Sequence, residues 1–471
     1  MYHKLMAGRN IKWVMFVITA IGNFIAMLDS TTVNLALYPM SVDLNVTMGQ
    51  IQWVIIAYML VLTVFLPFFG KLGDIFPKNK LYSVGYLVFA IGAILSIVSP
   101  NYISLIVFRC IEALGASMML SNAQAIIAKI FAKNRRGKAL GLNGCLVAIG
   151  GMLGPALGGL LIHTFNWHWV FAPCVPVALI GAVYSWKMLP NYVKKRKAFK
   201  FDYKGFIYFT ISLFSLLLAI SEGYHWGWTS LKILLLGFIT LFFGALFYYR
   251  DSSISYPMIN FSIFKIMPFT FGNLAVLMSY MAMFTNSVLL PFYLQEILKL
   301  NALVAGLLIL PYSITLSITA PISGRLSGKY GSRYLTLAGP VVYIIALVIF
   351  TLFDANTPKW GIVVASGIMG VGNGLFQSPS NNAIMTSVSK QELGIASGIL
   401  ALSRNMGNIL GVAITITLFQ SFREFFLSLS QPYNMAFLNS FKLTMCFGIV
   451  FGVCCLIFAY IAYKPRKTKA I

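Results

Sequence analysis

The chain has 471 residues, of which 59% are hydrophobic and only 10% are charged. A typical soluble domain carries about 25% charged residues, so this composition excludes an ordinary soluble protein and indicates one built for lipid. The formal net charge of +24 at pH 7 would also suit a nucleic-acid-binding protein, but the distribution of that charge along the chain indicates a membrane topology instead.

Apolar segments long enough to cross a bilayer recur along the whole chain. A membrane-spanning helix needs about 20 mostly apolar residues, and we expect fourteen such helices. The first segment is expected to remain as a span, because it is too long for a signal peptide and has no small-residue cleavage site. The predicted spans are residues 11–38, 50–70, 80–99, 101–128, 138–163, 167–189, 204–221, 230–249, 269–292, 302–322, 334–353, 359–386, 393–421 and 437–463.

Positive charge is concentrated in the loops on the side of the two termini, for example in KNK at 78–80 and KKRK at 194–197. Because loops rich in Lys and Arg face the cytoplasm, we expect a multi-pass protein of the cell membrane with both termini in the cytoplasm. These loops are expected to contact anionic lipid head groups and not nucleic acid. The only Lys and Arg residues on the opposite side are Lys232, Lys299, Lys359, Arg423 and Lys442.

Apart from lysines close to the span ends, four charged residues lie inside the predicted spans: Asp29, Arg109, Glu112 and Arg404. With a helix rise of 1.5 Å per residue, the first three lie about 12–16 Å below the outer boundary, near the midplane of the bilayer. Arg109 and Glu112 stand on adjacent turns, near enough to pair. Charges at this depth are costly and usually face a cavity or each other. Two acids beside one Arg would titrate as a coupled pair.

The two halves of the chain resemble each other. The glycines at 137, 141, 150 and 154 match those at 394, 398, 407 and 411 at a constant offset, and GKLGDIFPK at 70–78 matches GRLSGKYGS at 324–332. The sequence therefore predicts a six-helix bundle over residues 1–200, an inserted pair of spans over 201–255 and a second six-helix bundle over 256–471. Repeated halves with glycines in paired spans favour alternating access around a central site.

Several stretches resemble motifs of the major facilitator superfamily, in particular its fourteen-span drug:proton antiporter branch. LDSTTVNLAL at 28–37 is similar to the first-span motif, RCIEALGAS at 109–117 to the fourth-span motif and GGMLGPALGG at 150–159 to the antiporter motif of span five. The resemblance implies an all-α membrane fold of two six-helix halves plus two extra central helices. It covers nearly the whole chain.

The resemblance also implies roles for particular residues. It implies that Asp29 and Arg109 take part in proton coupling and substrate binding, and that Asp29 joins Arg109 at a shared cavity. Glu112 stands where the branch usually has Gln, so it either titrates during transport or replaces that Gln as a neutral side chain. For Asp74 the alternatives are conformational locking and a helix cap. The residues expected to control conformation are Gly70, Asp74, Lys78, Gly150, Gly154, Pro155, Gly158 and Gly159.

Other polar and aromatic residues of the predicted spans are candidates for lining the cavity, although most membrane aromatics pack in cores or at interfaces. For Arg404 a role in packing or gating is the alternative to a substrate contact. The candidates are Trp53, Tyr58, Asn143, Tyr280, Gln377 and Arg404.

These features favour a transporter that is not an enzyme. The sequence has no G-x-x-x-x-G-K-[ST] phosphate loop, so we expect an ion gradient to supply the energy, with no cofactor and no metal. The leading hypothesis is a monomeric, proton-coupled exporter of amphipathic small molecules, cationic compounds being an open alternative, in contact with protons and membrane lipids. Export or flipping of a lipid or an endogenous metabolite is a second hypothesis, and a non-transporting membrane sensor is a third.

Overall fold

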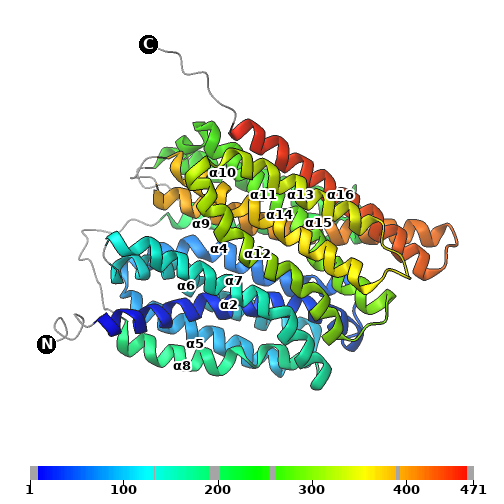
Figure 1. The fold of residues 1–471 in the computed structure, drawn as a ribbon, viewed down its shortest axis with the longest axis horizontal. Coiled ribbons are helices and arrows are strands. Elements are labelled where there is room, and N and C mark those ends of the chain that lie inside the picture. The colour runs from blue at the N-terminus through cyan, green and yellow to red at the C-terminus, as the bar shows by residue number, and fades with distance from the viewer. Residues whose placement is uncertain (1–8, 132, 190–201, 255–260, 389–392, 464–471) are drawn as a thin grey trace, which may run out of the picture. The chain divides into compact units, whose positions relative to one another are not determined.

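The computed structural model describes residues 9–131, 133–189, 202–254, 261–388 and 393–463 (Figure 1). These residues form long helices joined by short connections, and no strand occurs among them. The expected all-α fold is confirmed. The predicted domain boundaries near residues 200 and 255 fall outside the described ranges and stay predictions.

The helices follow the predicted spans closely. The long helices are α2 (Arg9–Asp43), α4 (Trp53–Ile75), α5 (Lys78–Ile97), α6 (Tyr102–Ile130), α7 (Lys133–Thr164), α8 (Cys174–Met188), α9 (Tyr203–Trp226), α10 (Leu231–Ser253), α11 (Met267–Phe292), α12 (Ala302–Tyr330), α13 (Arg333–Thr351), α14 (Lys359–Thr386), α15 (Leu393–Ser428) and α16 (Tyr433–Ala462). The short ones are α3 (Met48–Ile51), η1 (Trp167–Phe171), η2 (Phe261–Lys265) and η3 (Tyr293–Ile297), of which η3 is a π-helical turn.

Within the described residues, 13 helical segments are long and apolar enough to cross a bilayer. The chain is therefore a multi-pass membrane protein. Helix α14 has 28 residues but is not among the 13, because Asn373, Gln377 and Ser378 with their polar neighbours lower its apolar content. Its length still matches the predicted span 359–386.

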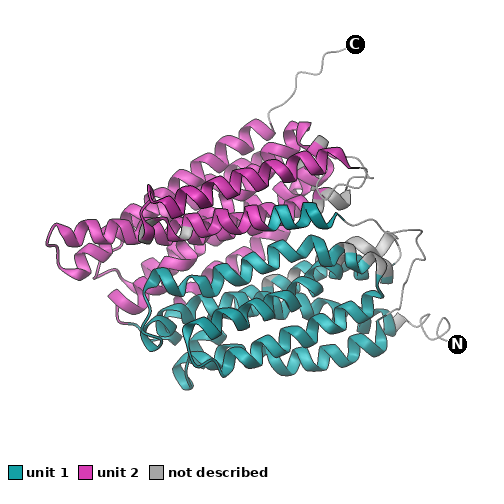
Figure 2. Ribbon diagram, turned by 180° about the vertical axis from the view of Figure 1, so that it is seen from behind, with its two compact units in different colours: residues 1–210, 300–307 teal, residues 211–299, 308–471 magenta. Residues whose placement is uncertain are grey.

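The chain divides into two compact units (Figure 2). Unit 1 consists of residues 1–210 and 300–307, and unit 2 of residues 211–299 and 308–471. The first turns of α12 therefore belong to unit 1, although the rest of that helix belongs to unit 2.

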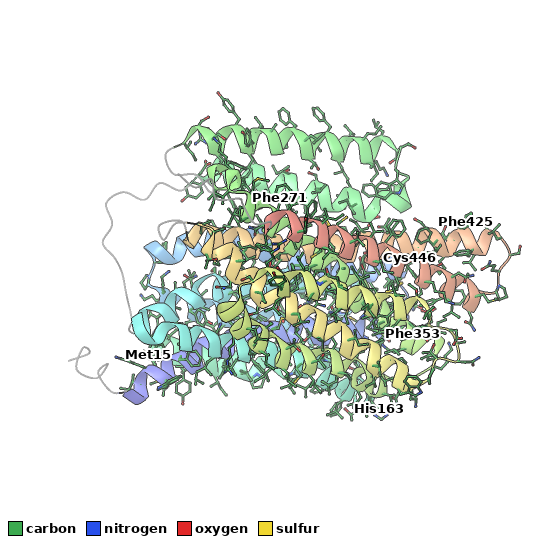
Figure 3. The ribbon with its side chains drawn as sticks, turned by 45° about the horizontal axis from the view of Figure 1, so that its top comes forward. Met15, His163, Phe271, Phe353, Phe425 and Cys446 are labelled. Atoms are coloured by element: carbon green, nitrogen blue, oxygen red, sulfur yellow. The ribbon has the colours of Figure 1, made fainter. Side chains whose placement is uncertain are left out.

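In unit 1, α2 packs along α7, and α6 packs against both α4 and α5. Met15, near the start of α2, and His163, near the end of α7, mark opposite ends of this unit (Figure 3). Two buried tyrosine hydroxyls inside it are satisfied by backbone carbonyls, as an apolar surrounding favours. The Tyr82 hydroxyl donates to the Thr19 carbonyl over 2.7 Å, and the Tyr86 hydroxyl donates to the Ile18 carbonyl over 2.6 Å.

Unit 2 repeats one of the helix pairings of unit 1. Helix α11 is the first helix of the second predicted six-helix bundle, and it packs along α15 just as α2 packs along α7. The matching glycines sit at these contacts: a Cβ on Gly150 would lie 2.7 Å from the Phe24 carbonyl oxygen, and one on Gly407 would lie 2.5 Å from that of Leu277. The two glycines thus allow the same close backbone approach in both halves, which supports the internal repeat expected from the sequence.

Candidate functional site

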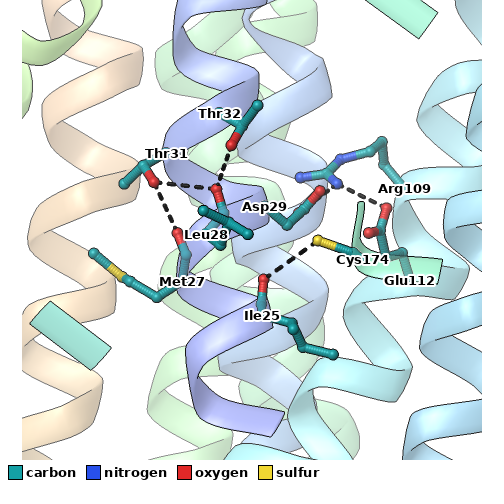
Figure 4. A network of polar contacts seen from close by, with 9 residues as sticks. All are labelled: Ile25, Met27, Leu28, Asp29, Thr31, Thr32, Arg109, Glu112 and Cys174. Atoms are coloured by element: carbon teal, nitrogen blue, oxygen red, sulfur yellow. Dashed lines mark hydrogen bonds and ion pairs between the residues drawn. The ribbon is translucent and has the colours of Figure 1, made fainter. Parts of the chain in front are cut away.

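A buried charge cluster joins α2 and α6 inside unit 1 (Figure 4). The Arg109 Nη1 atom lies 2.7 Å from Asp29 Oδ2 and 2.7 Å from Glu112 Oε2. One nitrogen therefore donates to two carboxylates. The contacts expected among these three residues are confirmed, while their roles in proton coupling and substrate binding stay predictions.

The charge cluster has almost no contact with solvent. The side chain of Arg109 is 1% exposed, and those of Asp29 and Glu112 are 0% exposed. Close packing of α5 on α6 helps to enclose it, since a Cβ on Gly92 would lie 2.4 Å from the backbone nitrogen of Glu112. Any larger residue at this position would push α6, and the carboxylate it carries, away from α5.

Two aromatic rings complete the surroundings of Arg109. The Arg109 guanidinium carbon lies 4.1 Å from the ring centre of Tyr58 on α4 and 5.5 Å from that of Phe171 on η1. Both distances suit cation–π attraction, which gains strength where water is excluded. Tyr58 was a predicted cavity residue. Phe171 was not, because nothing in the local pattern of η1 indicates that its ring meets a residue of α6.

Several polar atoms of the charge cluster lack a hydrogen-bond partner among the described residues. They are Asp29 Oδ1, Glu112 Oε1, Arg109 Nε and the Tyr58 hydroxyl oxygen. With both acids ionised, one cation faces two anions, and the charge cluster carries a net negative charge. Because a buried uncompensated charge is costly, this arrangement favours uptake of one positive charge, either a proton or a cation.

The predicted conformational residues lie at helix ends and helix contacts of unit 1. Lys78, buried at the start of α5, donates through Nζ to Asn122 Oδ1 over 3.1 Å, and the Asn122 side-chain nitrogen donates to the Phe69 carbonyl. Gly70 lies on α4, and the side chain of Asp74 is outside the described part of the structure. The sequence did not predict this role of Asn122, because a single amide in a long apolar helix carries no spacing signal.

The glycine motif of α7 lies at two helix contacts. A Cβ on Gly154 would lie 2.0 Å from Thr31 Oγ1, and one on Gly158 would lie 2.9 Å from the Thr32 methyl carbon, so both glycines face α2. Gly159 faces the start of α12, where a Cβ would lie 2.5 Å from the Ala302 carbonyl oxygen. Pro155 lies within this run and Gly150 contacts α2 one turn earlier.

The candidate cavity residues fall into two separate groups. In unit 1, Asn143 accepts a 2.9 Å hydrogen bond from Asn23, and Trp53 is half-buried on α4. In unit 2, Gln377 donates to the Tyr280 hydroxyl, while Arg404 has no hydrogen bond or ion pair with another described residue. The described residues contain no group of three His, Cys, Asp or Glu side chains that would hold a metal ion.

Comparison with known proteins gives one matching family and several similar chains. Residues 19–267 and 272–471 match the family Major Facilitator Superfamily. The riboflavin transporter RibZ of Clostridioides difficile is 34% identical over 94% of this chain and 97% of its own length. The multidrug transporter protein MdtP of Bacillus subtilis is 29% identical over 84% of this chain and 73% of its own.

Two further similarities extend this comparison. The lincomycin resistance protein LmrB of Listeria monocytogenes is 25% identical over 87% of this chain and 86% of its own. A crystal structure of a bacterial homologue of the human lysosomal transporter Spinster superposes with a TM-score of 0.71, 14% identity and 97% coverage of both chains. At that identity the likeness concerns the fold alone.

Proposed function

This chain belongs to the major facilitator superfamily, and we propose that it is a proton-coupled transporter that exports amphipathic small molecules by alternating access. The observation that carries the proposal is the charge cluster, in which Arg109 pairs with both Asp29 and Glu112 in a fully buried setting. The multidrug and lincomycin resistance relatives support the substrate class.

The proposed coupling follows from charge balance at the charge cluster. With one proton on either acid, a single anion remains for Arg109, and the cluster is neutral. When that proton leaves, the second carboxylate needs another positive group nearby. A proton arriving from outside and a cationic substrate thus compete for the same carboxylates, and an uncharged substrate exchanges with the proton indirectly. Energy comes from the proton gradient, without a cofactor, and the working form is a monomer.

Transport of an endogenous metabolite is the second candidate function. The RibZ relative, named as a riboflavin transporter, matches this chain over 94% of its length. That coverage includes both halves and the helices between them, so the similarity is not confined to a shared scaffold segment. A metabolite exporter would use the same charge cluster for coupling and differ only in the residues that contact the substrate.

Reconstitution into vesicles distinguishes these functions. The purified protein is placed in vesicles with a pH gradient, and lumenal pH is followed while lipophilic cations, neutral drugs, riboflavin and labelled lipids are added in turn. Proton flux triggered by an amphipathic drug is the expected result. Flux with riboflavin alone would favour the metabolite transporter, lipid movement without proton flux a flippase, and no response to any compound a non-transporting sensor.

We also propose that both termini lie in the cytoplasm of a bacterial cell, because the loops on their side carry most of the 35 Lys and Arg residues. An epitope added at the C-terminus should then stay unlabelled by antibody in intact spheroplasts and become labelled after permeabilisation. Labelling of intact spheroplasts would reverse the proposed orientation.

A further inference from the structure

Arg404 is a cation inside a candidate membrane span. The residue lies within the candidate span Gly398–Ser428 of α15 and is half-buried. Its side chain has no hydrogen-bond or ion-pair partner among the described residues, although its Nε atom is buried. Arg109 in unit 1, by contrast, has two carboxylates. Because an arginine at membrane depth is costly unless it meets water or an anionic or carbonyl group, Arg404 indicates a place where a ligand completes the site.

The surroundings of Arg404 are polar on one side. Asn408 follows one turn later on the same face of α15, and Gly407 between them packs closely on Tyr280 of α11, where a Cβ would lie 2.8 Å from the Tyr280 Cβ. Tyr280 also accepts a hydrogen bond from Gln377 of α14. The three helices α11, α14 and α15 are neighbours within unit 2 (Figure 1). Tyr280 therefore joins the polar face of α15 to that of α14.

The polar face of α14 continues with Asn381, one turn beyond Gln377. Its side-chain oxygen is buried and has no hydrogen-bond partner in the part of the chain that the structure describes, and the same holds for the side-chain oxygen of Asn408. The unpaired atoms of this region thus include one cationic donor, Arg404 Nε, and two carbonyl acceptors. Unpaired buried polar groups cost free energy in an apolar surrounding, so a ligand that binds here should present an acceptor to Arg404 and a donor to an amide oxygen.

Aromatic rings adjoin these polar groups. The hydroxyl of Tyr312 on α12 donates to the sulfur of Met283 over 2.8 Å, and Met283 lies about one turn from Tyr280 on α11. Both rings are half-buried and offer flat apolar surface to a planar molecule.

These requirements separate the ligand classes. A lipophilic cation would be repelled by Arg404, and a carboxylate would satisfy Arg404 but none of the amide oxygens. A planar heteroaromatic ring with an imide or cyclic-urea edge presents carbonyl, N–H and carbonyl in a row. Its carbonyls accept from Arg404, and its N–H donates to an amide oxygen.

We propose that Arg404, Asn408, Asn381 and Gln377, with the rings of Tyr280 and Tyr312, form a subsite of unit 2 that binds the imide edge of a planar heteroaromatic substrate. This inference rests on the proposed transport function and narrows its substrate class. In it, the charge cluster of unit 1 supplies proton coupling, and the subsite of unit 2 selects the compound.

Binding measurements on the full-length protein in lipid nanodiscs, without a pH gradient, test this subsite. The probes are riboflavin, which carries an imide edge, its N3-methyl analogue, which lacks the N–H donor, and tetraphenylphosphonium, which has no such edge. We expect riboflavin to bind the wild-type protein at least about tenfold more tightly than the N3-methyl analogue, because methylation leaves an acceptor of the site unpaired. Equal affinities, or no riboflavin binding, would overturn the subsite.

A matched pair of variants on α15 locates the effect. Arg404→Gln should weaken riboflavin binding by about tenfold or more and leave tetraphenylphosphonium binding unchanged or stronger. Arg423→Gln, further along the same helix, should bind riboflavin like the wild type. Wild-type affinity in Arg404→Gln would contradict the assignment. If Arg404→Gln does not fold, the comparison of riboflavin with its N3-methyl analogue on the wild-type protein still tests whether the subsite exists.

The outcome separates the subsite from the proposed coupling. Proton-coupled export of a drug without any preference for the imide would overturn the subsite and leave the transport function intact. Selective riboflavin binding in a protein that moves no protons would overturn the coupling and leave the subsite intact.

Discussion

Arg109 donates to two acidic side chains through one nitrogen while its ring neighbours Tyr58 and Phe171 exclude water from its faces. Its removal leaves two buried carboxyl groups without a counter-charge. Breaking a buried ion pair in this way costs about 3–5 kcal/mol, so Arg109→Ala should lower the melting temperature in detergent markedly. The exposed Arg325→Ala is the control and should melt like the wild type. Equal melting temperatures for both variants would contradict the importance of these contacts for folding.

Glu112 is the acid that the fourth-span motif does not require. Glu112→Gln keeps the size of the side chain and a hydrogen bond to Arg109 but removes one titrating group. If Glu112 titrates during transport, this variant should exchange fewer protons per substrate, or lose export of doubly charged cationic compounds, while still moving neutral compounds. The measurement is the ratio of proton to substrate flux in vesicles. A ratio and a pH profile identical to those of the wild type would show that Glu112 is only a neutral stand-in.

The i, i+3 spacing predicted the contact of Arg109 with Glu112, and helix rise placed Asp29 at a similar depth. The contact of Asp29 with Arg109 was implied by the family resemblance and not by spacing. The aromatic neighbours and Asn122 were not predictable in the same way. Phe171 reaches Arg109 from a 310 turn, and Asn122 meets Lys78 across 44 residues of sequence. Such contacts depend on how helices cross, which hydropathy and spacing do not specify.

Helices α7 and α15 each contain glycines at close contacts with a neighbouring helix and a glycine in open space. A Cβ on Gly150 of α7 meets the Phe24 carbonyl at 2.7 Å, whereas a Cβ on Gly144 meets nothing within 4 Å. Gly150→Ala should therefore destabilise the protein by about 1–3 kcal/mol, as overpacking does. Gly144→Ala should be neutral or stabilising by up to about 1 kcal/mol, because Ala favours helix. Thermal unfolding in detergent measures both.

The same comparison applies to α15, with Gly407 in contact and Gly398 in open space. A larger loss of stability in Gly398→Ala than in Gly407→Ala would contradict the packing described for the repeat. The constant offset between the two sets of glycines predicted the internal repeat, but it did not predict which helix each set contacts. The π-helical turn η3, which directly follows α11, had no such signal, because apolar periodicity does not distinguish it from an α-helical turn.

The chain as a whole is a repeated helical scaffold in which only a few charged residues lie inside the membrane spans. Composition alone predicted a membrane protein, and span lengths predicted nearly every helix, because the apolar requirement of the bilayer is strict. Substrate identity was less predictable, because it depends on a few polar atoms such as those around Arg404 and not on the scaffold.

Proton coupling through Asp29 is tested most directly by following lumenal pH and substrate together in vesicles that contain either the wild-type protein or Asp29→Asn. Asp43→Asn, at the end of the same helix, serves as the matched control. We expect substrate-triggered proton flux in the wild type and in Asp43→Asn, and none in Asp29→Asn, whose transport should no longer respond to the pH gradient. Gradient-driven export by Asp29→Asn at the wild-type rate would contradict the assignment of the proton to this charge cluster.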